Sequence, residues 1–179
     1  AYMLGDQRFA SRRPDVLTYQ SDILTEDVTV AGPITVRLTA STSGTDCDWV
    51  VKVIDVFPDT TTTPRNTLAR GVRMEGYQMM VRGDVLRGKF RHSLARPEPF
   101  KPNAPTAVTY DLQDVFHRFK KGHRIMVQVQ SSWFPKIDRN PGVFMDVYKA
   151  KDSDFRKTTQ RVYRSAGKLS GVELGIAKD

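Results

Sequence analysis

The sequence predicts an all-β fold, an antiparallel β-sandwich with one or two short helical turns. Apolar and polar residues alternate with a period of two in several stretches, and helical periodicity is nearly absent. Turn residues and proline-bearing connections separate these stretches. With 179 residues, the chain suits a single domain over residues 1–179 and can bury a sizeable core.

The clearest strand pattern covers residues 34–41. Alternate positions there are apolar, namely Ile34, Val36, Leu38 and Ala40. Polar residues occupy the intervening positions, a Gly32-Pro33 turn precedes the run, and a Ser43-Gly44 turn follows it. We expect a half-buried strand.

A longer run, residues 48–57, carries apolar residues on both faces. This distribution predicts a central strand that is covered on both sides, with Trp49 in the core. Asp55 shares the face of Trp49, so we expect a buried carboxylate with a charged partner, an arginine. Pro58 ends the run, and residues 60–64 are expected to form an exposed loop.

The remaining patterns predict further strands at residues 15–20, 67–74, 77–81, 107–112, 124–131 and 158–164. Four prolines between residues 96 and 106 predict an unpaired connection across the surface. Short helical turns are expected within residues 114–121 and 146–158. Seven to nine strands with long connections favour a jelly roll; an immunoglobulin-like sandwich is the alternative, although the chain lacks its Cys…Trp…Cys spacing.

The chain is basic, with 28 Lys+Arg against 20 Asp+Glu and a net charge of +8. Such an excess suggests nucleic acid as a partner, but no interleaved aromatic pattern offers bases a stacking platform. We therefore interpret the basic residues as a solvated sheet face and expect no nucleic-acid partner. No apolar run is long enough to span a membrane, so no membrane partner is expected either. The N-terminus lacks the pattern of a signal peptide, and the chain reads as a fragment that opens mid-sequence.

No catalytic constellation is visible. A nucleophilic hydrolase needs an activated Ser or Cys, a base and an orienting acid, and no G-x-S-x-G elbow occurs at any of the 12 glycines. Serines such as Ser41, Ser43, Ser131 and Ser132 fall at expected strand ends, where turn roles are usual. The single cysteine, Cys47, excludes an internal disulfide and a multi-cysteine metal site. We expect no catalytic residue and no cofactor.

Metal binding has equally weak support. Asp46 and Asp48 form a D-x-D pair, as do Asp152 and Asp154, but neither pair has the glycine and distal glutamate of an EF-hand loop. His117 and His123 are six residues apart rather than the four that would place them on one helix face. We assign no metal ligand; a structural calcium in the loops stays open.

Four ordered blocks resemble a known family. They are residues 6–9 with 12–17, residues 24–33, residues 41–58, and above all residues 122–141, GHRIMVQVQSSWFPKIDRNP. Together they run from about residue 2 to Arg164. On these blocks the chain resembles the C-terminal non-catalytic domain of the cocaine esterase/X-Pro dipeptidyl-peptidase (CocE/NonD) serine hydrolases, particularly the α-amino acid ester hydrolase branch.

The resemblance implies a three-part parent enzyme acting on acyl esters, amides or X-Pro substrates. Its α/β-hydrolase domain carries the Ser-Asp-His triad and a helical cap, and both would lie upstream of a galactose-binding-domain-like jelly roll such as this one. No catalytic residue of the family therefore carries over to this chain. The resemblance further implies packing against the upstream domains, a share in shaping the substrate cleft, and homo-oligomer contacts. It alone suggests a periplasmic or secreted parent.

Interdomain surfaces favour aromatic and arginine residues, because these combine buried area with satisfied polar ends. The candidate interdomain contacts are Arg8, Arg12, Arg13, Trp133, Phe134, Asp138 and Arg139. The alternative is that the charged members pair within the sandwich. A second hypothesis is a carbohydrate-binding module, with Trp133 and Phe134 as its aromatic platform. As an isolated domain the chain should expose an unusually large apolar patch.

Overall fold

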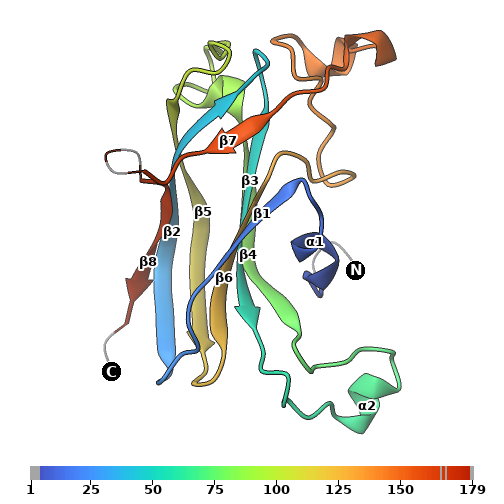
Figure 1. The fold of residues 1–179 in the computed structure, drawn as a ribbon, viewed down its shortest axis with the longest axis vertical. Coiled ribbons are helices and arrows are strands. Elements are labelled where there is room, and N and C mark those ends of the chain that lie inside the picture. The colour runs from blue at the N-terminus through green and yellow to red at the C-terminus, as the bar shows by residue number, and fades with distance from the viewer. Residues whose placement is uncertain (1–4, 166, 168, 178–179) are drawn as a thin grey trace.

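The computed structural model describes residues 5–165, 167 and 169–177 as two antiparallel β-sheets (Figure 1). The strands of this part of the chain are β1 (Val16–Gln20), β2 (Val28–Thr42), β3 (Asp48–Val56), β4 (Gln78–Arg87), β5 (Thr106–Phe119), β6 (Arg124–Gln130), β7 (Gln160–Val162) and β8 (Gly171–Ile176). The all-β prediction is therefore confirmed. The narrower jelly-roll assignment stays a prediction.

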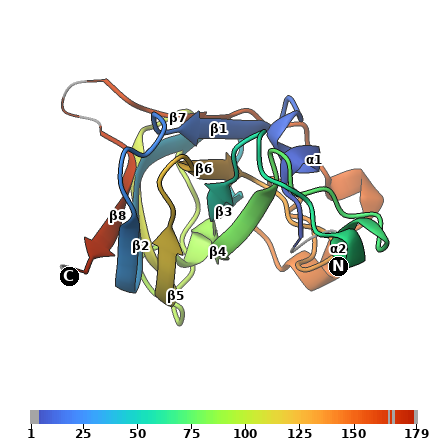
Figure 2. The same cartoon turned by 90° about the horizontal axis from the view of Figure 1, so that it is seen from below.

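Sheet A has the strand order β1-β6-β3-β4, and sheet B has the order β5-β2-β7, with β8 also paired to β2. Helical segments are short and lie in the connections: α1 (Arg8–Ser11), α2 (Arg65–Leu68) and the 3₁₀ turns η1 (Gly88–Phe90), η2 (Val147–Lys149) and η3 (Asp152–Asp154). Seen from below, α1 and α2 lie on the side of the molecule remote from β8 (Figure 2). No described helix has the length and apolar character needed to cross a membrane.

The core lies between the two sheets. Alternate residues of β2, from Ile34 to Ala40, are buried there as the sequence pattern predicts, and Trp49 and Val51 of β3 face them. The Tyr110 hydroxyl donates a hydrogen bond to the Trp49 carbonyl at 2.9 Å, which ties sheet B to sheet A. The residues that alternate with Trp49 along β3 are buried as well, so the prediction of a strand covered on both faces is confirmed.

Three predicted elements are wrong. The Gly32-Pro33 turn expected before residues 34–41 lies inside β2, where both residues pair with β5. Residues 67–74, expected as a strand, contain the end of α2 and a turn, because this segment extends beyond sheet A and Pro64 starts a helical turn there. Residues 114–121, expected as a helical turn, mostly continue β5 along β2 to Phe119. The connection between β4 and β5 holds no strand after η1, as its prolines predict, and the helical turns expected within residues 146–158 are η2 and η3.

Candidate interdomain surface

The outer face of sheet A, which points away from the core, is covered by two segments, residues 5–15, which include α1, and residues 131–141. We call them the first and the second arm, and together the covering layer. Gln7 donates its backbone N–H to the Gln78 carbonyl of β4 at 2.9 Å. The Trp133 ring lies over Gly83, where an added Cβ would meet it at 3.3 Å. The absence of a side chain at Gly83 therefore makes room for Trp133 on the sheet.

A lysine is buried beneath this layer. Lys52 alternates with the core residues of β3, so it points to the outer face, yet its exposed fraction is 1%. Its Nζ donates to Gln7 Oε1 at 2.9 Å and lies 4.8 Å from the Trp133 ring centre and 5.9 Å from that of Phe9. Two aromatic faces and one amide oxygen thus stabilise the cation where water cannot reach it.

Burial, together with the smaller effect of the positive charges of Arg13 and Lys136, lowers the pKa of Lys52 to about 8. Lys136 also lies over Trp133, with 4.1 Å between its Nζ and the ring centre. The layer therefore concentrates positive charge around one tryptophan. Both arms contribute to this charge, since Arg13 follows α1 and Lys136 follows Trp133.

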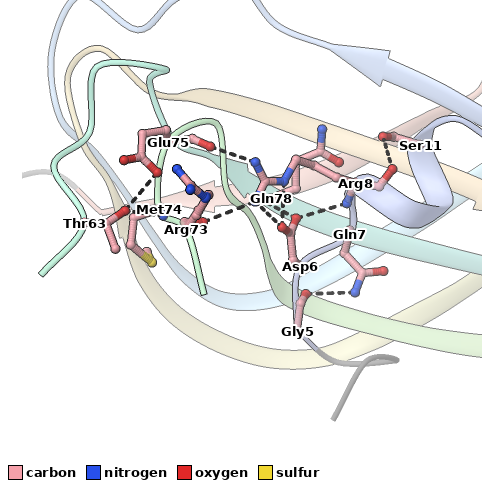
Figure 3. A network of polar contacts seen from close by, with 10 residues as sticks. All are labelled: Gly5, Asp6, Gln7, Arg8, Ser11, Thr63, Arg73, Met74, Glu75 and Gln78. Atoms are coloured by element: carbon pink, nitrogen blue, oxygen red, sulfur yellow. Dashed lines mark hydrogen bonds and ion pairs between the residues drawn. The ribbon is translucent and has the colours of Figure 1, made fainter. Parts of the chain in front are cut away.

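Arg8 joins the first arm of the layer to the long β3–β4 connection (Figure 3). Its Nε donates to Asp6 Oδ2 at 2.6 Å, and its Nη1 and Nη2 donate to the carbonyls of Glu75 and Arg73 at 2.8 and 3.2 Å. Inside the connection, Thr63 Oγ1 donates to Glu75 Oε2 and accepts from the Met74 N–H. Arg8 thus acts as an internal clamp that fixes this connection against α1.

The second arm is anchored by a buried carboxylate. Asp48, 1% exposed, accepts hydrogen bonds from Asn140 Nδ2 at 2.9 Å and from Arg87 Nε at 3.2 Å. Arg87 also donates to the Asp138 carbonyl at 3.1 Å. Burial raises the pKa values of Asp48 and of nearby Asp46, because a carboxylate loses hydration there. Through these bonds, residues 138–141 (Asp-Arg-Asn-Pro) anchor the second arm to sheet A.

Asp55 is buried as expected, but the expected arginine partner is wrong. Its oxygens are bonded to two histidines, His117 Nε2 at 2.9 Å and His123 Nδ1 at 2.7 Å. His117 comes from sheet B and His123 directly precedes β6 of sheet A, so Asp55 links the two sheets at one end of the sandwich. Adjacent phenylalanine rings pack on both imidazoles, Phe119 on His117 and Phe57 on His123.

The described residues contain no activated serine or cysteine paired with a base, the arrangement that a nucleophilic hydrolase needs. The remaining histidine, His92, bonds Glu98, so each of the three histidines is bonded to a carboxylate rather than to a serine or cysteine. Burial raises the pKa of the Cys47 thiol, which disfavours the nucleophilic thiolate. In the described part of the chain, no group of three or more His, Cys, Asp or Glu residues could hold a metal ion.

Next to the covering layer lie two hollows of about 450 and 460 Å³, and aromatic residues form part of their lining. Arg87, Phe90 and Tyr148 line both hollows. Tyr148 is 84% exposed, Phe134 is 59% exposed and Phe144 is 38% exposed. We call Phe90, Phe144 and Tyr148, which line the hollows, together with the exposed Phe134 that precedes Pro135 of the first hollow, the aromatic rim. It belongs to the loops that follow β4 and β6.

The outer face of sheet B, unlike that of sheet A, is mainly polar. On the outer face of sheet B, Arg37 pairs with Glu173, and Thr35 Oγ1 donates to Asp111 Oδ1 at 2.7 Å. Phe116 is an exposed exception at 82%. The polar character predicted for a solvated sheet face therefore applies to sheet B. The outer face of sheet A carries apolar residues and a covering layer instead.

The candidate residues divide into three groups: those bonded within the domain, one that is buried, and those that are exposed. Arg8 is held by internal bonds, and Arg13 forms an exposed pair with Asp15, which agrees with the alternative of pairing within the sandwich. Trp133 is 3% exposed and therefore offers no platform for a sugar ring. Phe134, Arg12 and Asp138 are exposed.

Arg139 is also exposed, and its guanidinium lies 5.1 Å from the Phe155 ring centre.

Phe9, Lys52 and Tyr148 also belong to this surface but were not predicted from the sequence. Only for Lys52 does the sequence contain an indication, namely a lysine between valines in a strand that is apolar on both faces.

A family model described as the X-Pro dipeptidyl-peptidase C-terminal non-catalytic domain matches residues 5–173. The chain belongs to this family. Among curated proteins, cocaine esterase from Rhodococcus sp. (strain MB1 Bresler) is 32% identical over 174 residues, which are 97% of this chain and 28% of the esterase. The family resemblance inferred from the four sequence blocks is confirmed.

Solved structures agree with this PepX C-terminal family. An aminopeptidase from a marine sediment Thaumarchaeota archaeon matches 99% of this chain with a TM-score of 0.90 and 42% identity. An α-amino acid ester hydrolase matches 98% with a TM-score of 0.89 and 44% identity. The chain spans 28% of each of these structures. A CocE/NonD family hydrolase from Staphylococcus aureus, 14% identical with a TM-score of 0.63 over 97% of this chain and 32% of its own, shares the fold alone.

Proposed function

We propose that this non-catalytic domain is one β-sandwich of a larger serine hydrolase acting on acyl esters, amides or X-Pro substrates. In this proposal the covering layer and the aromatic rim pack against the catalytic and cap domains, help to shape the substrate cleft, and contribute to oligomer contacts. The longer relatives support it, since the chain matches only 28% of the esterase and of the first two enzyme structures.

The difference between the two outer faces carries the proposal. Sheet B presents the Arg37–Glu173 ion pair to solvent, whereas sheet A carries the covering layer with exposed Phe9 and Phe134, next to the exposed Tyr148 of the aromatic rim. Exposed aromatics that gather with cations on one side are typical of protein interfaces. The absence of a nucleophile–base pair among the described residues fits a supporting role.

The first test is enzymatic. The purified chain should hydrolyse neither p-nitrophenyl acetate nor an X-Pro p-nitroanilide. Turnover that survives further purification and disappears with a serine-directed inhibitor would refute a non-catalytic role.

The second test measures association with the catalytic part of the parent protein, produced as a separate chain. Tyr148→Asp should weaken association at least tenfold, because a charge would be buried in an apolar contact. Phe116→Asp is the matched control, since Phe116 is equally exposed but lies on the outer face of sheet B. Equal effects of both variants, or an effect of Phe116→Asp alone, would contradict the proposed interface.

A further inference from the structure

A groove of about 580 Å³ lies between α1, the β3–β4 connection and the start of β6. Its lining includes Arg8, Arg12, Pro58, Gln78, Gly122 and Arg124. Figure 3 shows one wall, where Arg8 and Gln78 lie beside the β3–β4 connection and Ser11 lies on α1. The groove is distinct from the two hollows of the aromatic rim, with which it shares no lining residue.

The charges that face the groove are mostly positive. Three arginines line it against one carboxylate, that of Asp59. Arg8 is already compensated by Asp6 and two carbonyls. The Arg124 side chain makes one hydrogen bond, from Nη1 to the Ser21 carbonyl at 2.8 Å, and the Arg12 side chain makes none within residues 5–165, 167 and 169–177. Arg12 and Arg124 therefore keep donors for an external anion.

Apolar side chains in the wall narrow the class of ligand. Ile23 and Phe57 add apolar surface to the groove that Arg12 and Arg124 line. An inorganic anion cannot cover apolar surface, whereas a peptide with carboxylate side chains supplies both negative charge and aliphatic carbon. The lining therefore favours an acidic peptide over an inorganic anion.

We infer that this groove binds an acidic peptide segment of the catalytic or cap part of the parent protein, with Arg12 and Arg124 receiving its carboxylates. The inference rests on the proposed function for the source of the segment. The excess of arginines supplies the charge complementarity. The share of the relatives' length that lies outside this chain supplies room for such a segment.

The test titrates the chain with a blocked tetraglutamate peptide, followed by NMR chemical shifts. Saturable shifts are expected at the backbone amides of Arg12, Gln78 and Arg124. The double variant Arg12→Gln/Arg124→Gln should weaken binding about tenfold or more, because two charge-assisted hydrogen bonds are lost. Arg96→Gln/Arg161→Gln removes the same charge outside the groove and should bind like the wild type. Thermal unfolding verifies that both double variants fold.

Three results would overturn the inference. One is equal weakening in both double variants, which indicates non-specific charge attraction. Another is absence of saturable shifts in a folded wild-type chain. The third is stronger binding of single-stranded DNA than of the peptide at the same residues, which indicates a polyanion site. These results are separable from the proposed function, because association with the catalytic part can persist without peptide binding, and peptide binding can persist without association.

Discussion

Substitution of Lys52 by methionine tests whether the covering layer buries a charge. The pKa of Lys52 falls from 10.5 to about 8 in the folded protein, so the unfolded chain binds more protons between these values. Stability contributed by this residue is therefore lowest below pH 8, where burial of the ammonium costs most, and it rises as pH increases toward 10.5. Lys52→Met removes this dependence.

The expected magnitude follows from the same two values. From pH 7 to pH 9.5, the free energy of unfolding of the wild type should rise by about 2 kcal/mol relative to that of Lys52→Met. Urea unfolding of both proteins at several pH values, read by tryptophan fluorescence, measures this difference. Comparing the two proteins cancels the contributions to stability of the other groups that titrate between pH 7 and pH 9.5. A difference that stays constant with pH would refute the buried-charge account.

Two further substitutions test the anchors of the layer, with Arg37→Gln on sheet B as their common control. Arg87→Gln leaves the buried Asp48 carboxylate without its cation and should cost about 3 kcal/mol in urea unfolding. Arg37→Gln, which breaks an exposed pair, should change stability by less than about 1 kcal/mol, and similar losses would contradict the anchor. Arg8→Ala should speed proteolytic cleavage within residues 57–77, because three hydrogen bonds to Asp6 and to that connection are lost. A cleavage rate equal to that of Arg37→Gln would rule out the clamp.

The sequence predicts the fold best where alternation and burial agree. Residues 34–41 and 48–57 alternate or are apolar on both faces, and both are strands of the core. The helical turn expected within residues 114–121 is wrong because β5 contains an irregularity opposite Pro33, with Gln113 at a φ of 61°. The irregularity shifts the buried positions from Leu112 to Val115 and Phe119. Spacings of three and four imitate a helix, although the chain remains a strand.

The candidate surface is less predictable, because its residues meet only through tertiary contacts. Trp133 is followed by Phe134, yet one ring is buried and the other exposed, since Gly83 of a distant strand makes room for Trp133. Asp55 lies 62 residues from His117 and 68 from His123, so no local pattern names its partners. Arg8, chosen as an interdomain contact, is occupied by carbonyls of a loop more than 60 residues away.

Hydrogen–deuterium exchange of this chain, alone and within the parent protein, tests most directly which face is an interface. We expect slower exchange within the parent for residues 5–15, residues 131–141 and the loop that carries Tyr148. Exchange in β8, at the edge of sheet B, should stay unchanged. Protection confined to the strands of sheet B, with the covering layer exchanging as it does in the isolated chain, would contradict the account.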